Sequence, residues 1–171
     1  AGRTKTIAVI VDDVSNDYSA QVLRSISDFA HEREIEVFSG SHESDPAIEN
    51  ELIHSFISRG VEGFVLMTCE EDHSQWKTDA ERGIAFAFVD RPPQKAKFDS
   101  VLTANAEGVR EAVTHLIENG HSRIAYLGDD ESIQTARDRF AGGHRDGPRD
   151  RPLRQREDRA SHARAGEGRE G

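Results

Sequence analysis

The sequence predicts an α/β protein organised around a doubly wound parallel sheet. Short runs of apolar, largely β-branched residues recur between residues 7 and 127, and segments with apolar residues at helical spacing separate them. Continuous apolar runs of this length are typical of strands that are buried on both faces. Strands joined by helices pair in parallel through right-handed crossovers, so helices are expected to cover both faces of the sheet.

The predicted strands are the apolar runs themselves. The first run contains only alanine, valine and isoleucine, and it follows directly on a short polar segment at the start of the chain. These runs are shorter than a typical helix, and a buried strand needs no more than about eight residues. The predicted strands are Ile7–Val11, Ile35–Phe38, Phe64–Met67, Ile84–Val89, Val101–Leu102 and Ile124–Leu127.

Five segments have a helical pattern, and the second of them has the clearest ends. Asp45 is a suitable N-cap, Pro46 suits the first helical position, and Gly60 ends the pattern. In the fourth helix, Asn105 marks the start and Gly120 the end. The predicted helices cover residues 17–33, 46–59, 73–82 and 105–119, with a fifth starting at about residue 132.

Composition excludes several classes of protein. No apolar run approaches the roughly 20 residues of a membrane span, and the chain enters its first strand without a signal-peptide pattern. We therefore expect a cytoplasmic protein without membrane contact. The single cysteine, Cys69, excludes an internal disulfide and any multi-cysteine metal site. A net charge of −10 argues against nucleic-acid binding by this chain itself.

Residues 143–171 differ from the rest of the chain. They contain eight arginines, six acidic residues and one large apolar residue, Leu153. Such a segment cannot bury enough apolar surface to offset its ordering entropy, which predicts disorder. Interleaved acids and the lack of aromatic residues disfavour an arginine-rich nucleic-acid arm. The composition is also typical of a GC-rich gene read out of frame, so we expect a disordered or frameshifted tail.

The expected ligand site lies beyond the carboxyl ends of the strands, as in other open parallel sheets. The turn after the first strand begins with Asp12 and lacks the glycines of a dinucleotide or phosphate loop. Cys69 has no sequence feature that would lower the pKa of its thiol. The eight histidines form no metal-binding pattern. We therefore predict no catalytic residue, no metal and no cofactor, and hence a protein that is not an enzyme.

Acids, amides, hydroxyls and arginines follow the strands, together with the aromatic ring of Tyr18. These groups suit a small polyhydroxylated ligand, because carboxylates and amides bind hydroxyls and an aromatic ring stacks on a sugar. Solvated loops are also polar without any ligand. Composition alone leaves both interpretations open.

Six stretches carry a resemblance to a known family, in an order and at a spacing that together are specific. They are Lys5–Val11, Asn16–Tyr18, Ser58–Leu66, Ala87–Pro93, His115–Ala125 and Thr135–Gly142. The chain between residues 4 and 142 resembles the effector-binding core of LacI/GalR-type bacterial transcription regulators, which has the periplasmic-binding-protein-like type I fold. Two departures are Ala104, where the family usually has aspartate, and Asp17, where it has proline.

The resemblance implies a domain organisation. Residues 1–5 would be the end of a hinge, residues 6–142 the N-terminal subdomain of the effector-binding core, and residues 143–171 the atypical tail. The helix-turn-helix and the second subdomain of such regulators are then expected to be missing from this chain. By the same resemblance, effector-binding positions would be Asp12, Asn16, Tyr18, Met67, Thr68, Asp90, Arg91, Gln134, Thr135 and Arg139.

Among these positions, Asp90 and Arg139 are the main candidates, as an acceptor for hydroxyls and a forked donor that face one cleft. A salt bridge from Arg139 to Asp129 or Asp130 is the structural alternative. The implied function is that of the effector-sensing part of a transcriptional regulator, a repressor, which binds a small molecule, expected to be a sugar, between two subdomains and forms a homodimer. DNA would be bound only through the absent N-terminal domain. The alternative function is a sugar-binding receptor of an ABC-type transporter.

Overall fold

The structure is a computed structural model, and it describes residues 4–131, 133–145 and 155–157. The chain forms two compact units, Ala1–Leu102 and Thr103–Gly171. Arg3, which the sequence analysis assigns to the end of a hinge, lies outside the described residues. No helix among the described residues is long and apolar enough to cross a membrane.

The first unit contains a five-stranded sheet in which every neighbouring pair is parallel, in the order β2-β1-β3-β4-β5. The central strand β1 pairs with β2 on one side and β3 on the other, so that Ile10 lies beside both Gly40 and Leu66. The predicted fold class is confirmed. The strands are β1 (Thr6–Val11), β2 (Glu36–Ser41), β3 (Gly63–Leu66), β4 (Ala85–Val89) and β5 (Asp99–Val101).

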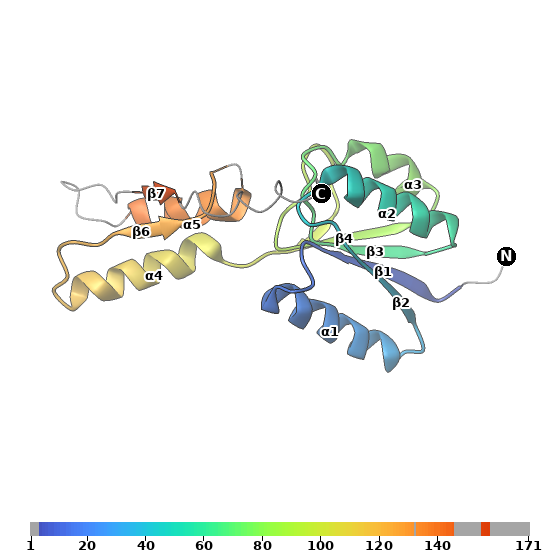
Figure 1. The fold of residues 1–171 in the computed structure, drawn as a ribbon, viewed down its shortest axis with the longest axis horizontal. Coiled ribbons are helices and arrows are strands. Elements are labelled where there is room, and N and C mark those ends of the chain that lie inside the picture. Colours follow the sequence, from blue (N-terminus) through green and yellow to red (C-terminus); the bar gives the residue numbers. More distant parts are fainter. Residues whose placement is uncertain (1–3, 132, 146–154, 158–171) are drawn as a thin grey trace, which may run out of the picture. The chain divides into compact units, whose positions relative to one another are not determined.

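Helices cover both faces of this sheet, with α1 (Asp17–His31) on one face and α2 (Pro46–Ser58) and α3 (Lys77–Glu81) on the other (Figure 1). The predicted start of α2 is confirmed, because Asp45 accepts a hydrogen bond from the amide of Ala47 and Pro46 is the first helical residue. The predicted helix over residues 73–82 is two pieces, a 3-10 turn η1 (Ser74–Trp76) followed by the short α3.

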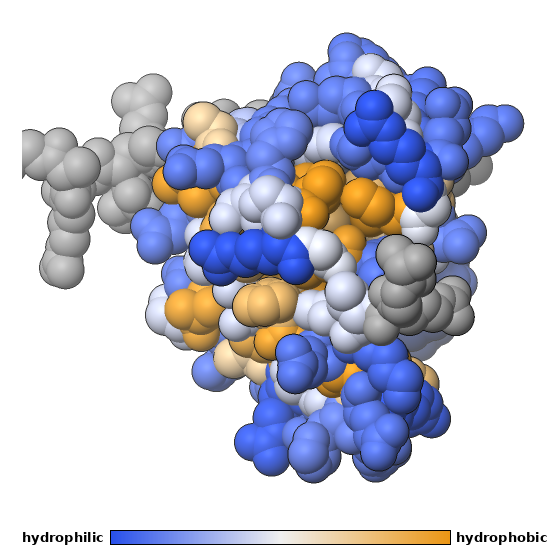
Figure 2. Space-filling model, turned by 90° about the vertical axis from the view of Figure 1, so that its right-hand side faces the viewer, coloured by the Kyte–Doolittle hydropathy of each residue, from blue (hydrophilic) through white to orange (hydrophobic). Residues whose placement is uncertain are grey.

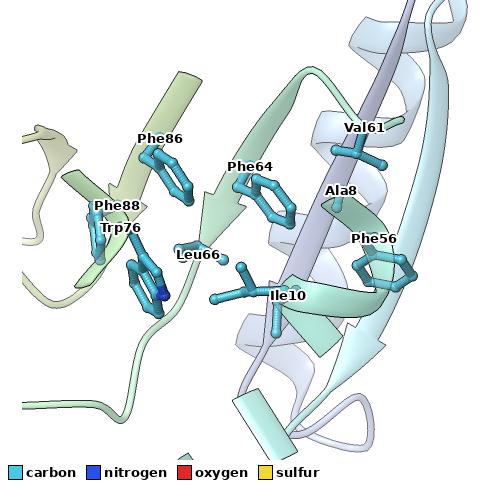
Figure 3. Packing of buried hydrophobic residues seen from close by; sticks show 10 residues of the cluster. Ala8, Ile10, Phe56, Val61, Phe64, Leu66, Trp76, Phe86 and Phe88 are labelled. Carbon is cyan, nitrogen blue, oxygen red and sulfur yellow. The ribbon is translucent and has the colours of Figure 1, made fainter. Parts of the chain in front are cut away.

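Two apolar clusters hold these layers together. The smaller cluster lies between α1 and the sheet and includes Val9, Val11 and Met67. The larger cluster lies on the α2 side, where rings from β3, β4 and η1 pack together (Figure 3). In it the ring of Trp76 stacks on Phe86 at a centroid distance of 5.8 Å. The Trp76 ring also stacks on Phe88, so these contacts hold η1 against β4.

The amino-terminal ends of the strands lie at the edge of the sheet opposite to their carboxyl ends. Seen from the side on which the chain begins, apolar side chains lie between two strongly polar regions (Figure 2). A hollow at the start of β1 is lined by Lys5, Thr6, Ile7, Arg33, Ile35 and Glu62. Parallel sheets bind ligands at their carboxyl ends, so this hollow is not the predicted site.

The second unit contains α4 (Asn105–Glu118), β6 (Tyr126–Gly128), α5 (Gln134–Arg145) and β7 (Gln155–Glu157). The sixth predicted strand therefore forms, but it pairs in parallel with β7 and forms a separate two-stranded sheet. The helices α4 and α5 approach each other closely at Gly142, where a side chain would overlap the backbone of Ala106.

Parts of the segment that the sequence sets apart as a tail have regular structure. Gly143–Arg145 complete α5, and Gln155–Glu157 form β7. Residues 146–154 and 158–171 lie outside the described residues. The frameshift or disorder of residues 143–171 therefore stays a prediction.

Candidate functional site

Seven predicted site residues follow β1, β3 and β4, which are neighbours in the sheet. Because parallel strands end at the same edge, these residues share the carboxyl-terminal edge of the first unit, here called the site edge. They are Asp12, Asn16, Tyr18, Met67, Thr68, Asp90 and Arg91.

The residues after β1 are the most accessible. The Asp12 carboxylate is about one third exposed, accepts a hydrogen bond from the Ser44 hydroxyl at 2.7 Å, and lies 3.4 Å from Nδ1 of His42. Asn16 caps α1, because its Oδ1 accepts from the amide of Tyr18 at 2.9 Å. The Tyr18 ring is 46% exposed. Asp12 and Tyr18 thus present a carboxylate and an aromatic surface to solvent.

The two predicted contacts after β3 are buried. The Met67 sulfur accepts a hydrogen bond from the Ser19 hydroxyl at 3.7 Å, and Met67 packs in the smaller apolar cluster. Thr68 is 2% exposed. Its hydroxyl donates to Glu49 at 2.7 Å and lies 2.9 Å from Nε2 of His73. Both residues therefore shape the site edge from beneath its surface in this structure.

Asp90 and Arg91 follow β4. The φ angle of Asp90 is +71°, a left-handed conformation that costs energy for a residue with a side chain. Its amide donates to the carbonyl of Val101 at 3.0 Å, which holds this turn against β5. A guanidinium N–H of Arg91 donates to the carbonyl of Thr68 at 3.3 Å. This contact joins the segments that follow β3 and β4.

The remaining predicted residues belong to the second unit, at α5. The Gln134 side chain donates to Asp138 and accepts from Arg137, and Thr135 is buried. Nε of Arg139 donates to Oδ1 of Asn105 at 2.8 Å, which ties α5 to the first turn of α4. A pocket shared by Asp90 and Arg139 stays a prediction, because these residues belong to different units.

Glu49 is a buried residue of the site edge that the sequence analysis did not identify. It lies in the first turn of α2 and is fully buried. One carboxylate oxygen accepts from the Thr68 hydroxyl at 2.7 Å. The other accepts from the amides of Cys69 at 2.8 Å and Glu70 at 3.2 Å, and from the Cys69 thiol at 3.2 Å. Four donors thus compensate a buried acidic group, as burial requires.

A sequence signal for Glu49 does exist. Glu49 shares one helical face with Ile53 and Phe56, at spacings of four and seven residues, and both of these are buried. An acidic residue within the apolar face of an amphipathic helix must find buried donors.

Two fully buried histidines flank Glu49. Nδ1 of His73 accepts from the amide of Gln94 at 2.7 Å, and Nε2 can then donate to the Thr68 hydroxyl. Burial lowers the pKa of His73, so the ring is neutral at pH 7. Nε2 of His42 lies 2.6 Å from the carbonyl of Met67, and its Nδ1 accepts from the amide of Ser44. Both rings therefore connect strand ends with the loops that follow.

His42, Glu49 and Cys69 bring their ligand atoms within 4.8 Å of one another, as a metal site would require. Each of these side chains already has hydrogen-bond partners in the chain, so their burial needs no ion to explain it. Burial and the Glu49 carboxylate raise the pKa of the Cys69 thiol far above its ordinary value. The thiol is therefore protonated and a poor nucleophile at neutral pH.

Residues 4–159 match the family model described as periplasmic binding proteins and sugar binding domain of LacI family. The chain belongs to this family. The predicted resemblance is thereby confirmed, and the parallel α/β sheet agrees with it.

Curated relatives of this LacI-family chain are transcriptional regulators. The chain is 27% identical over 143 residues to the probable HTH-type transcriptional regulator EndR of Paenibacillus polymyxa. It is 25% identical over 144 residues to the HTH-type transcriptional repressor PurR of Aliivibrio fischeri. These matches cover 82% and 83% of this chain but 42% of each relative. The chain thus spans less than half the length of these relatives.

Solved structures agree with this assignment of the fold. A putative ribose operon repressor from Burkholderia thailandensis has a TM-score of 0.76 at 27% identity, and the match covers 82% of this chain and 54% of that one. A periplasmic binding protein/LacI transcriptional regulator from Alkaliphilus metalliredigens, complexed with D-xylulofuranose, has a TM-score of 0.78 at 21% identity, with 91% and 57% covered. The second likeness supports the fold alone.

Proposed function

We propose that this chain is the effector-sensing part of a LacI-type transcriptional repressor and that its effector is a neutral carbohydrate. The observation that carries the proposal is the site edge of a LacI-family sheet, where Asp12, Tyr18, Asp90 and Arg91 follow neighbouring strands. A carboxylate accepts from sugar hydroxyls, a guanidinium donates to them, and an aromatic ring stacks on a sugar face.

Effector binding would act on DNA binding through a change of population. A ligand shifts the balance between two states of a regulator only as far as it binds one of them more tightly. DNA would be bound in the cytoplasm, by a helix-turn-helix that is not part of these 171 residues. No catalytic step is part of this proposal, and the regulators among the relatives support a binding protein.

A homodimer is part of the proposal. On α1, Phe29 is 58% exposed, while Val22 and Ile26 of the same helix pack against the sheet. The guanidinium of Arg33 lies 3.5 Å from the centre of the Phe29 ring. Exposed aromatic residues on a helix that is otherwise packed are typical of an interface. Sedimentation equilibrium of the wild type and of Phe29→Ser tests this part.

A transport receptor is the second candidate, because the matched family model includes periplasmic binding proteins as well as LacI-type domains. Both candidates would bind the ligand at the same surface. They differ in what the ligand-bound protein acts on, which is DNA for a repressor and a membrane transporter for a receptor. The regulators among the curated relatives favour the repressor.

The experiment is ligand-detected NMR on the 171-residue chain, with millimolar panels of neutral monosaccharides and of their phosphate esters. We expect saturation transfer to at least one neutral sugar, loss of that transfer in Asp90→Asn, and no change in Asp28→Asn. Asp28 is the matched control, because it is exposed near the end of α1 that lies away from the site edge. Transfer to phosphate esters alone, or to no sugar, would contradict the proposal.

A further inference from the structure

Glu49 is the most completely buried acidic group at the site edge. Its burial removes the carboxylate from water, which is costly unless donors replace the lost hydration. The four donors come from three consecutive residues after β3, namely Thr68, Cys69 and Glu70. The first turn of a helix is also favourable for an acidic side chain, because the helix dipole places partial positive charge at this end. Glu49 therefore attaches the start of α2 to the segment that follows β3.

The Thr68 hydroxyl is saturated by this arrangement. It donates to Glu49, accepts from the Glu70 amide at 3.1 Å, and lies 2.9 Å from Nε2 of His73, which can donate to it. A hydroxyl has one hydrogen to donate and two lone pairs, so all three are in use. The conformation of Thr68 is thus fixed by Glu49 on one side and by His73 on the other.

The backbone carbonyl of Thr68 carries this restraint to Arg91. A guanidinium N–H of Arg91 donates to that carbonyl at 3.3 Å. If the peptide of Thr68 moves, the acceptor for Arg91 moves with it. A chain of contacts therefore runs from a buried residue of α2 to a cation at the site edge.

We infer that Glu49 is a positioning residue of the effector site. It fixes the backbone from Thr68 to Glu70 and, through the Thr68 carbonyl, the direction of the Arg91 guanidinium. The inference rests on the proposed function, because it takes the site edge to be the ligand surface. Glu49 itself does not touch the ligand, since it is fully buried.

The test compares Glu49→Gln with Glu51→Gln in the 171-residue chain. Both changes remove one charge from α2 and retain the shape of the side chain, but Glu51 is exposed. In Glu49→Gln we expect the Cys69 and Glu70 amides to exchange with solvent at least about tenfold faster, because each loses a charge-assisted hydrogen bond. The NMR signal of the Arg91 side-chain N–H should shift and broaden. Glu51→Gln should leave both readouts as in the wild type.

A second pair of variants covers the case in which Glu49→Gln does not fold. Thr68→Val removes the hydroxyl at nearly constant shape, and Thr68→Ser retains it. We expect Thr68→Val to shift the Arg91 signal and Thr68→Ser to restore it. A general loss of stability would change unfolding in both variants and would not separate them by the Arg91 signal.

The outcomes decide the inference without any ligand. An unchanged Arg91 signal in Glu49→Gln and Thr68→Val overturns it, even if the amides exchange faster, because Glu49 would then stabilise the loop without orienting Arg91. Failure of all sugars to bind would refute the proposed function. The Arg91 and amide readouts would still show whether Glu49 orients this edge.

Discussion

At the scale of single residues, the buried polar groups of the site edge satisfy one another. His73 connects the segment after β3 to the segment after β4, through Thr68 on one side and Gln94 on the other. Its ring also lies edge-on to Phe88 at a centroid distance of 4.9 Å. A neutral histidine suits this place, because an imidazolium would place a charge against the aromatic cluster.

The lowered pKa of His73 predicts a pH dependence of stability. Below about pH 6.5 the unfolded chain takes up a proton on this residue, whereas the folded chain does so only at lower pH because burial opposes it. The free energy of unfolding therefore falls as the pH falls from about 6.5, by at most about 1.4 kcal/mol per pH unit for one proton.

His73→Gln should reduce this dependence. A glutamine amide can donate to Thr68 and accept from the Gln94 amide without titrating. Urea unfolding between pH 7 and 5 measures the slope for the wild type, His73→Gln and His54→Gln, the last an exposed histidine of α2. Equal slopes in all three proteins would show that His73 is not the group responsible.

Asn16 is a predicted site residue whose role in the structure is local. Its Oδ1 caps α1, so Asn16→Ala should destabilise the first unit by about 1 kcal/mol. Asn16→Asp retains an acceptor at the cap and should cost little. Urea unfolding of both variants checks this, and an equal loss in the two would rule out a capping contribution.

The sequence predicted which residues belong to the site edge better than it predicted which of them face solvent. Asp12, Asp90 and Arg91 follow strands that pair side by side, as expected. Thr68 follows a strand as well, but its hydroxyl is used by Glu49 and His73. The position of a residue directly after a strand determines at which edge of the sheet it lies. Its burial depends on partners far away in the sequence, which no local pattern reveals.

At the scale of elements, hydrophobic periodicity predicted all five strands of the first sheet to within a few residues. Continuous apolar runs such as the one in β1 identify buried strands because both faces are covered. The same pattern does not say which strand a run pairs with. The run near Tyr126 therefore predicted a strand correctly but gave no sign that it pairs with Gln155–Glu157 in a separate sheet.

The contact between α4 and α5 predicts opposite effects for two glycines. Gly142→Ala would place a side chain against the backbone of Ala106, so it should destabilise the second unit by about 2 kcal/mol or more. Gly108 lies in α4, and an added Cβ there would meet no atom of the described residues within 4 Å beyond its own stretch of helix. Gly108→Ala should stabilise α4 by up to about 1 kcal/mol.

Amide hydrogen exchange of α4 measures the stability of this helix in both glycine variants. We expect faster exchange in Gly142→Ala and slower exchange in Gly108→Ala. If Gly142→Ala exchanges as slowly as the wild type, the two helices do not approach as closely as the structure shows.

At the scale of the whole molecule, the chain divides at Leu102 and Thr103. The sequence analysis placed residues 6–142 in one subdomain because the resemblance to LacI/GalR-type regulators implies it. The five strands of the first sheet and both apolar clusters lie within residues 6–101. The first unit therefore contains the full set of elements that a layered α/β domain needs.

Residues 1–102 should fold without the rest of the chain. We expect the fragment to unfold cooperatively in urea and to give amide NMR signals that overlay those of residues 6–101 in the 171-residue chain. A fragment without dispersed signals would mean that the second unit is required for the first to fold. Residues 103–171 expressed alone are the complementary sample.

Trp76 is the only tryptophan of the chain, and its indole nitrogen has no hydrogen-bond partner among the described residues. The tryptophan fluorescence of the protein, excited at wavelengths that tyrosine does not absorb, therefore originates beside His73, one contact away from Thr68. Its emission should be blue-shifted, as for an indole in an apolar environment. Any rearrangement of the segment after β3 that admits water would shift this emission to the red, so the protein carries its own optical reporter and needs no attached dye.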